Sequence, residues 1–308
     1  MTLTDDFRQA VLDGLGQSRK AIPCRFLYDE TGSGYFDDIT RLDEYYPTRT
    51  ERSILKTALP DMAVRIGPGA SVLELGSGTS EKTGALLAAL EDPRCYVPLD
   101  IDEATLEDAA GRLRQAFPHL PVVPLHADFN DVWTLPPQCL PPVLCFFPGS
   151  TIGNFDKPEA ETFLRHIRSN LGPNARLLIG VDLVKDTHIL EAAYDDAKGV
   201  TAAFNLNLLV RINRELCGDF KPEAFRHRAV YNEDRACIEM YLVSQTNQTV
   251  RIGGTLIQFA AGEMVHTEDS HKYTPEGFAT LAGRAGWRRT GMWMDDGKLF
   301  SVQLFEAE

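Results

Sequence analysis

The sequence predicts an α/β protein in which helices cover both faces of a parallel sheet and a β-containing insert interrupts the sheet. Short, continuously apolar segments alternate with helical segments between residues 71 and 184, as in buried parallel strands joined by crossover helices. After Lys185 the alternation stops, and residues 236–268 show the period-two pattern of antiparallel strands. The 308 residues are enough for about two domains of common size.

The N-terminal region is expected to begin with a helix in FRQAVLDGL. Residues 23–51 are rich in aromatic residues, glycine and acids, and contain four tyrosines within nineteen residues. Such a segment predicts either a folded cap or a wall of an active site. A second helix is expected in TERSILKTALPDMAVRI, where apolar residues recur at helical spacing.

The alternating region supplies the expected sheet. Strands are expected in SVLEL, CYVPLDID, PVVPLHADF, VLCFF and ARLLIGVDLV. Helices are expected in SEKTGALLAALEDP, which has a serine start signal at Ser80 and a proline stop, in EATLEDAAGRLRQAF and in PEAETFLRHIRSNL. These segments place a core domain at residues 50–186 and 273–308.

The insert and the chain end complete the expected fold. Residues 186–216 are predicted to form a long helical segment. QTVRI and TLIQF are predicted to form a hairpin with its turn at Gly253–Gly254. TPEGFATLAGRAGW predicts a helix, and RTGMWMDDGKLFSVQLF a closing hairpin. Residues 1–49 and 187–272 are therefore predicted to make a second α+β lobe.

Composition narrows the classes of function. The net charge is −13, with 31 Lys+Arg against 44 Asp+Glu, so no nucleic-acid partner is expected. No apolar run is long enough for a membrane span, and the acidic start does not resemble a signal peptide. The six cysteines form no CxxC pair. We therefore expect no metal site, reduced thiols and a cytoplasmic location. A monomer is also expected.

A glycine-rich turn gives the first functional signal. In ELGSGT a strand ends and Gly76 and Gly78 let the backbone turn tightly and approach a ligand. A dinucleotide fingerprint would need a third glycine where Glu81 stands, and no phosphate loop is present. Glu74, the acid just before the turn, suits a cofactor carrying positive charge better than a pyrophosphate. By itself the motif could also be an ordinary strand–helix turn.

Two further acids follow neighbouring strands. Asp100 ends the second strand, where a carboxylate can accept both ribose hydroxyls of a nucleoside. Asp128 can accept from an adenine amino group, and Phe129 offers a ring face to the base. Together with the turn at Gly76, these residues predict a site for S-adenosyl-L-methionine.

The fourth strand and the chain end point to the same fold class. VLCFF runs into PGSTIGNF, and in class I methyltransferases the methyl acceptor lies beside this loop. Asn154 offers an amide donor and a carbonyl acceptor to a small zwitterion, although it could equally be a turn residue. The C-terminal hairpin stands where these enzymes add an antiparallel last strand. We therefore predict a class I S-adenosylmethionine-dependent methyltransferase (Rossmann-like) core with a second, substrate-binding lobe.

A longer series of motifs gives a more specific resemblance. The segments are YDETGSGYFDDITRLDEYYPTRTE, VLELGSGTSEKT, FFPGSTIGNF, YDDAKGVTAAFNLNLL, IEMYLVS and HTEDSHKY. Over nearly the whole chain they resemble the histidine-specific Nα-methyltransferase family, which includes the hercynine-forming enzyme of the ergothioneine pathway. The family also contains fungal enzymes that methylate a prenylated tryptophan.

The resemblance implies roles for individual residues. Asn154 and Tyr28 would be catalytic, and the substrate side would comprise Tyr28, Tyr45, Asn154, Tyr194, Met240, Glu268 and Ser270. Within that set, Tyr194 would hold the carboxylate, Met240 would pack beside the imidazole, and Glu268 and Ser270 would hydrogen-bond its nitrogens. The cofactor side would comprise Gly76, Lys82, Asp100, Asp128 and Phe129. The implied reaction is Nα-methylation of free L-histidine, with three transfers giving hercynine.

Each residue also has a plainer interpretation. Tyr28 and Tyr45 could be core aromatics, Met240 could be core, Glu268 could be a solvated acid and Lys82 a surface charge. Two other functions stay open: methylation of another amino acid such as an indole amino acid, and a non-catalytic methyltransferase-like binding protein. A nicotinamide oxidoreductase is disfavoured by Glu81.

Overall fold

A computed structural model describes residues 3–77, 81–129 and 133–308. The chain divides into two compact units, which are described separately. Unit 1 comprises Met1–Tyr46 and Lys185–Lys272, and unit 2 comprises Pro47–Val184 and Tyr273–Glu308.

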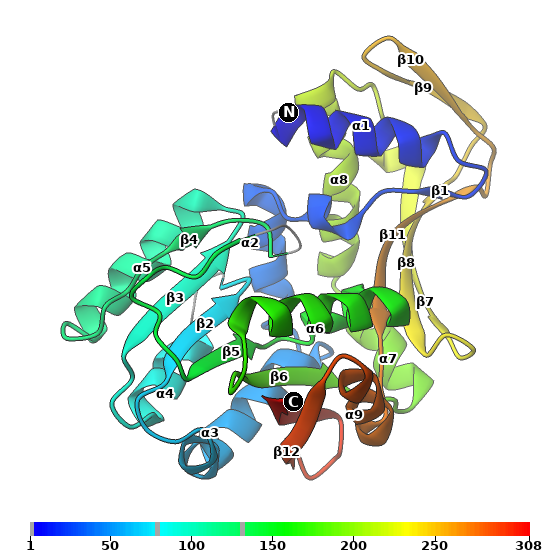
Figure 1. The fold of residues 1–308 in the computed structure, drawn as a ribbon. Helices are drawn as coiled ribbons and strands as arrows, with labels where there is room; N and C mark the ends of the chain where they lie inside the picture. Colours follow the sequence, from blue (N-terminus) through cyan, green and yellow to red (C-terminus); the bar gives the residue numbers. More distant parts are fainter. Residues whose placement is uncertain (1–2, 78–80, 130–132) are drawn as a thin grey trace. The chain divides into compact units, whose positions relative to one another are not determined.

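Unit 2 is built on a seven-stranded sheet with the order β12-β13-β6-β5-β2-β3-β4 (Figure 1). The five strands from β6 to β4 pair in parallel, whereas β13 is antiparallel to both of its neighbours. This confirms the predicted parallel sheet with an antiparallel last strand. The strands are β2 (Ser71–Leu75), β3 (Cys95–Asp100), β4 (Leu125–His126), β5 (Val143–Phe147), β6 (Arg176–Asp182), β12 (Trp287–Met294) and β13 (Phe300–Ala307).

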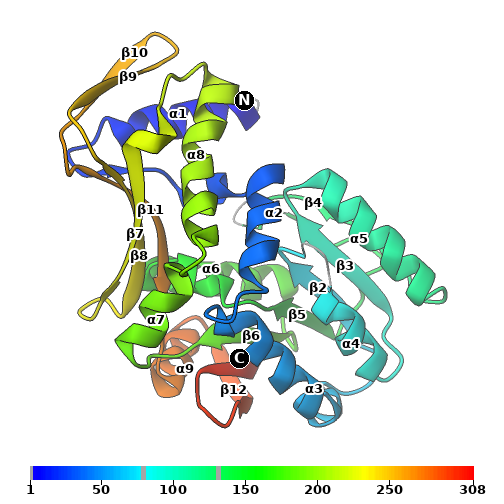
Figure 2. The same ribbon diagram turned by 180° about the vertical axis from the view of Figure 1, so that it is seen from behind.

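Helices cover both faces of this sheet because its strands are apolar on both sides. One buried cluster joins alternate strand residues such as Leu73 to α6 and α9, which stand in front in Figure 1. The other joins the intervening residues such as Val72 to α3, α4 and α5, which come forward in Figure 2. The helices are α3 (Tyr46–Ile66), α4 (Glu81–Ala89), α5 (Glu103–Ala116), η2 (Thr151–Asn154), α6 (Lys157–Leu171) and α9 (Pro275–Arg284).

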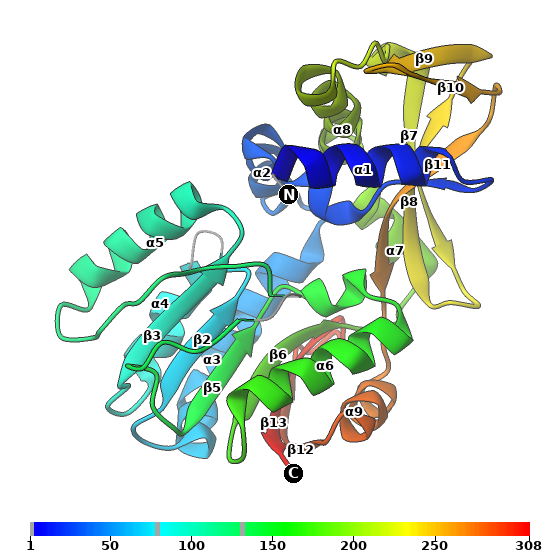
Figure 3. The same cartoon turned by 45° about the horizontal axis from the view of Figure 1, so that its top comes forward.

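Unit 1 contains a four-stranded sheet of order β1-β11-β8-β7 and a separate β9–β10 hairpin (Figure 3). Helix α8 lies against the four-stranded sheet, where the Asn205 side chain donates to the Tyr241 carbonyl at 3.2 Å. The strands are β1 (Lys20–Ala21), β7 (Phe225–Asn232), β8 (Cys237–Ser244), β9 (Gln248–Ile252), β10 (Thr255–Phe259) and β11 (Met264–His271). The helices are α1 (Leu3–Leu15), η1 (Cys24–Leu27), α2 (Glu30–Ile39), α7 (Thr187–Tyr194), α8 (Val200–Leu216) and η3 (Pro222–Ala224).

The structure corrects two local predictions and adds two strands. The long helical segment over 186–216 is interrupted between α7 and α8, where the Asp196 carboxylate accepts from the backbone N–H of Val200 and Thr201 and starts a new helix. The strand predicted in PVVPLHADF shrinks to β4, because two prolines in that segment cannot donate to a ladder. Strands β1 and β7 were not predicted.

Two of the predicted features lie outside the described residues: the second glycine of the turn, Gly78, and the helix start signal at Ser80. Among the described helices, none has the length and apolar character that crossing a membrane requires.

Candidate active site

The glycine-rich turn follows β2 at the carboxyl edge of the parallel sheet. Gly76 is exposed with a φ of +66°, a backbone conformation that other residues adopt only with strain. Its N–H donates to the Leu99 carbonyl at 2.9 Å, which ties the turn to the end of β3. A Cβ on Gly76 would lie 3.6 Å from the Phe129 ring. The turn is therefore open toward a ligand and borders an aromatic side chain.

The acids predicted for the cofactor lie along the same edge. Asp100 is the last residue of β3 and is half-buried, and its backbone carbonyl accepts from the Ala127 N–H at 3.1 Å. Asp128 and Phe129 come two and three residues after the end of β4 and are also half-buried. The Phe129 ring packs edge-on against Phe147, with centroids 5.8 Å apart. Gly76, Asp100, Asp128 and Phe129 thus follow three adjacent strands, where ligands bind in open α/β sheets.

Lys82, which is predicted to hold the cofactor, forms an ion pair with another side chain of unit 2. Its ammonium pairs with the carboxylate of Glu51, which is 1% exposed, and that carboxylate also accepts from the Gly149 N–H at 3.0 Å. A Cβ on Gly180 would come within 2.0 Å of Glu51 Oε1, so only glycine in β6 leaves room for the carboxylate. The cofactor role of Lys82 stays a prediction. In this structure its ammonium forms an ion pair with the Glu51 carboxylate.

Sequence reasoning missed Glu51, although a signal was available. It stands three and four residues before Ile54 and Leu55, on the apolar side of the predicted helix. An acid on the buried stripe of a helix requires a partner.

Glu74, expected to suit a cationic cofactor, is also buried. It is 2% exposed and accepts a hydrogen bond from the Tyr96 hydroxyl. Tyr96 belongs to the buried cluster under α3, α4 and α5. The Glu74 side chain therefore lies on the face of the sheet that these helices cover.

Asn154 ends the short helix η2 after β5. It is half-buried, and the preceding turn is fixed by Ser150, whose Oγ accepts from the Asp182 N–H at 2.9 Å. Ser150 itself has a φ of +60°. This left-handed residue in a buried loop holds the chain before Asn154 in an uncommon conformation, as functional loops often do.

The substrate-side residues of unit 1 gather on the strand pair β8–β11. Glu268 pairs with Met240 across the two strands, and Ser270 follows on the same face of β11. All three are buried, at 7%, 1% and 4% exposure for Glu268, Met240 and Ser270. Glu268 Oε2 has no hydrogen-bond partner among the described residues. An unsatisfied carboxylate oxygen at this depth is costly unless a ligand supplies a donor.

Lys272, directly after β11, joins this cluster. The side chain is 1% exposed, and its Nζ lies 2.8 Å from both the Tyr194 hydroxyl and Ser270 Oγ. The two hydroxyl oxygens are 2.7 Å apart. Sequence reasoning missed Lys272, although its spacing of two and four residues from Ser270 and Glu268 is the period that places strand residues on one face.

The predicted tyrosines form an aromatic cluster beside these groups. The Tyr45 and Tyr194 rings meet edge-on with centroids 6.0 Å apart, and Tyr28 meets Phe204 of α8 at 5.3 Å. Tyr28 is positioned through its neighbour Asp29, whose carboxylate caps α2 and accepts from Asn207 of α8 at 2.7 Å. The Phe36 ring contacts both Tyr28 and Tyr45, so unit 1 brings Tyr28, Tyr45 and Tyr194 into one chain of rings.

Burial governs the electrostatics of the cluster. Desolvation raises the pKa of Glu268 to about 7, against the opposing attraction of Lys272 and His266. Desolvation, with the negative charge of Glu268, also raises the pKa of Tyr28 above its usual value. Glu268 can therefore change protonation near neutral pH, whereas Tyr28 stays a neutral hydrogen-bonding group.

The opposite face of the same strands holds a charged network. The ligand atoms of Cys237, Asp269 and His271 lie within 4.8 Å of one another, a grouping that the sequence did not predict. The Arg235 guanidinium already pairs with Asp269 at 2.6 Å. Although burial opposes it, hydrogen bonds from His266 and Arg235 lower the pKa of Asp269. The Arg235 guanidinium therefore supplies the positive charge that a bound metal ion would supply in such a group.

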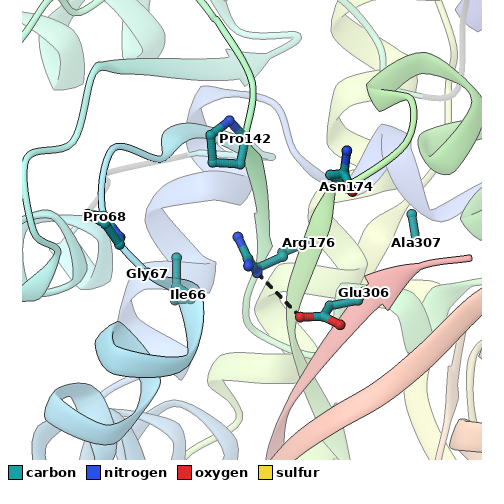
Figure 4. A pocket seen from close by; sticks show the side chains of 8 residues that line it. All are labelled: Ile66, Gly67, Pro68, Pro142, Asn174, Arg176, Glu306 and Ala307. Carbon is teal, nitrogen blue, oxygen red and sulfur yellow. Dashed lines mark ion pairs between the residues drawn. The ribbon is translucent and has the colours of Figure 1, made fainter.

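Unit 2 also holds a pocket of about 320 Å³, and none of the predicted cofactor-side residues lines it (Figure 4). Pro142 and Asn174 precede β5 and β6, so the pocket is at the amino ends of the strands, opposite Gly76. Its lining residues are Ile66, Gly67, Pro68, Pro142, Asn174, Arg176, Glu306 and Ala307. Across it Arg176 and Glu306 face each other at 3.7 Å.

Comparison with known proteins agrees with this geometry. Residues 7–307 match the family described as "Histidine-specific methyltransferase, SAM-dependent". The chain belongs to this family. S-adenosylmethionine is accordingly its cofactor.

Individual relatives in the family differ in their names. The chain is 42% identical to "Histidine N-alpha-methyltransferase" of Mycolicibacterium smegmatis, over 96% of this chain and 94% of the relative. It is 32% identical to "Ergothioneine biosynthesis protein 1" of Schizosaccharomyces pombe, over 82% of this chain and 34% of the relative. It is 29% identical to "L-tryptophan methyltransferase trpM" of Psilocybe serbica, over 95% and 90% of the two chains.

Proposed function

We propose that this enzyme transfers methyl groups from S-adenosylmethionine to the α-amine of free L-histidine, three times in succession, forming hercynine for ergothioneine biosynthesis. The observation that carries the choice of histidine is the buried Glu268 carboxylate, whose Oε2 has no partner among the described residues, two residues from Ser270 on one strand face. The relatives named for histidine methylation and ergothioneine biosynthesis support the same choice.

The hydrogen-bonding groups of an imidazole match the side chains of Glu268 and Ser270. Glu268 accepts a hydrogen bond from one ring nitrogen, Ser270 contacts the other, and Met240 packs against the ring. A site with a buried acceptor discriminates strongly against side chains that cannot donate to it, because the acceptor is then left unpaired. Phenylalanine has no donor, and an indole presents a single N–H on a larger ring.

The tyrosine cluster suits the product as well as the substrate. Each transfer leaves a bulkier and finally permanent cation on the α-nitrogen. Electron-rich ring faces attract such a cation, as in the aromatic cages that bind quaternary ammonium groups. Tyr28 and Tyr45 are proposed to line that environment. Tyr194 is proposed to hold the substrate carboxylate through the Lys272 ammonium, whose positive charge lies 2.8 Å from the Tyr194 hydroxyl and attracts the carboxylate.

The residues at the carboxyl edge of unit 2 fit the cofactor. The absent side chain at Gly76 leaves a cradle bordered by Phe129, and Asp100 stands where a carboxylate can accept from ribose hydroxyls. Asp128 is proposed to accept a hydrogen bond from the adenine amino group. Lys82 is proposed to lie beside the cofactor, with its ammonium held in position by the ion pair with Glu51. When bound, S-adenosylmethionine supplies an electrophilic methyl group on a sulfonium.

The chain's own contribution to the reaction is orientation of a neutral amine. An ammonium has no lone pair, so the α-amine must lose a proton before it can attack. Asn154 is proposed to orient the amine, with Tyr28 or water carrying the proton away, and alignment of nitrogen, methyl and sulfur supplies the proximity advantage. No residue of the described part of the chain stands out as a strong base for that amine. A monomer in the cytoplasm stays our expectation.

An indole amino acid is the second candidate, because the tryptophan methyltransferase of Psilocybe serbica belongs to the similar relatives. Methylation of histidine, tryptophan and phenylalanine at equal concentration separates the two. We expect methylated histidine to dominate, and Glu268→Ala to raise the KM for histidine and narrow its advantage over tryptophan. Preferred methylation of tryptophan by the wild type, or unchanged kinetics of Glu268→Ala, contradicts the proposal.

A further inference from the structure

The buried ammonium of Lys272 controls which groups donate in this cluster. An ammonium has three N–H donors and no acceptor. At 2.8 Å from each, it therefore donates to both the Tyr194 hydroxyl and Ser270 Oγ. Both hydroxyl oxygens accept at least one hydrogen bond before any substrate is present.

One more hydrogen bond links the two hydroxyl oxygens, which lie 2.7 Å apart. A phenol is a stronger acid than an aliphatic alcohol, so Tyr194 is the better donor of the pair. Ser270 Oγ then accepts from both Tyr194 and Lys272, which occupies its two lone pairs. The single Ser270 proton is left to be donated to a further group.

Glu268 lies on the same strand face as Ser270 and offers a hydrogen-bond acceptor where Ser270 offers a donor. An N–H donor from the substrate favours the charged form of Glu268, and as a carboxylate this side chain can only accept a hydrogen bond. Its Oε2 has no partner among the described residues. The face thus offers one acceptor and one donor. A neutral imidazole has one N–H and one bare nitrogen and matches this pair, whereas an imidazolium has two N–H groups, one of which would meet the Ser270 proton.

We propose that Lys272 is a positioning residue that determines specificity: by occupying an acceptor site on Ser270 it makes this serine a donor, and the enzyme thereby selects the neutral imidazole of histidine. This inference rests on the proposed function and deepens it. It concerns the protonation state of the substrate side chain, which neither the family nor the reaction fixes.

Other charged and titratable groups face this cluster. Tyr194 of α7 and Tyr231 of β7 lie near Lys272. Glu268 is within electrostatic reach of Lys272, His266 and Asp269, and it acts on Tyr28 from the N-terminal region. Removing the Lys272 charge therefore also favours protonation of Glu268. A test must separate this electrostatic effect from the hydrogen-bond effect at Ser270.

The test is ¹⁵N NMR of ring-labelled L-histidine bound to the enzyme, followed from about pH 5.5 to 8. In the wild type we expect one protonated and one bare ring nitrogen down to at least about one pH unit below the ordinary histidine pKa of about 6.5. Lys272→Met should return the pKa of the bound imidazole to about 6.5 or above and weaken binding at neutral pH by about tenfold.

Three further variants make the result specific. Lys272→Arg retains donors and charge and should keep the wild-type signature, and Lys198→Met, at an exposed position of unit 1, should leave it unchanged. Ser270→Ala, which keeps Lys272, should raise the pKa of the bound imidazole as Lys272→Met does. It serves in place of Lys272→Met if that variant does not fold.

Two results overturn the inference while histidine still binds. One is an imidazolium signature in the wild type near pH 6. The other is a wild-type signature in Lys272→Met or in Ser270→Ala, because the effect then does not pass through Ser270. If labelled histidine does not bind to the wild type, the proposed function itself fails and this inference with it.

Discussion

Replacing Glu268 by Gln should remove a pH dependence of stability that burial creates. The carboxyl group is 7% exposed, and desolvation raises its pKa from 4.5 to about 7. Between these values the folded protein holds a proton that the unfolded chain has lost. The free energy of unfolding therefore falls as pH rises through this window, and the contribution is fully lost above pH 7. Gln cannot titrate, so the variant lacks this slope.

The magnitude follows from the size of the shift. Each pKa unit corresponds to about 1.4 kcal/mol, so a rise from 4.5 to about 7 gives roughly 3 kcal/mol across the window, most of it between about pH 5 and 8. We expect Glu268→Gln to gain roughly this amount of stability relative to the wild type as pH is raised.

The assay is urea denaturation of both proteins at several pH values in that range, without histidine. Glu107→Gln is the matched control, because the Glu107 side chain is 58% exposed and should follow the wild-type curve within about 0.5 kcal/mol. If the Glu268→Gln and wild-type curves run parallel, the carboxyl group is not desolvated as described and the reasoning is refuted.

Three other predictions concern unit 2 and the predicted amine contact. Glu51→Gln should lower the free energy of unfolding by about 3 kcal/mol, because it leaves the Lys82 ammonium without its buried partner; an unchanged urea midpoint would contradict this. Gly180→Ala should destabilise the fold comparably, since its Cβ would lie 2.0 Å from Glu51 Oε1; wild-type stability there would show that the carboxylate can move at little cost. Asn154→Ala should reduce kcat by about a hundredfold with folding intact by circular dichroism; near-normal turnover would remove Asn154 from the site.

The sequence was sufficient to locate residues at the ends of the parallel strands. Gly76, Asp100 and Asp128 could be located because a parallel strand ends at a recognisable apolar-to-polar boundary and ligands bind at that edge. Glu268 and Ser270 came from the family resemblance, and β11 does place them on one face with Met240. Their roles are still predictions, whereas the sheet that positions them is described.

What could not be predicted depends on contacts between distant segments. The ion pair of Lys82 with Glu51 could not be predicted, because the two residues are thirty-one positions apart in different helices. Lys272 was not singled out, because its partner Tyr194 lies seventy-eight residues earlier in the chain. The break after α7 was missed because residues 186–216 are helix-forming on both sides of the Asp196 cap.

The most direct test of the central claim is mass spectrometry of free L-histidine after incubation with the purified enzyme and S-adenosylmethionine, with fragmentation to locate the added groups. We predict a product carrying three methyl groups, all on the α-nitrogen, and an unmodified imidazole. Methyl groups on the imidazole ring, or no methylation of histidine while tryptophan is methylated, would contradict the account.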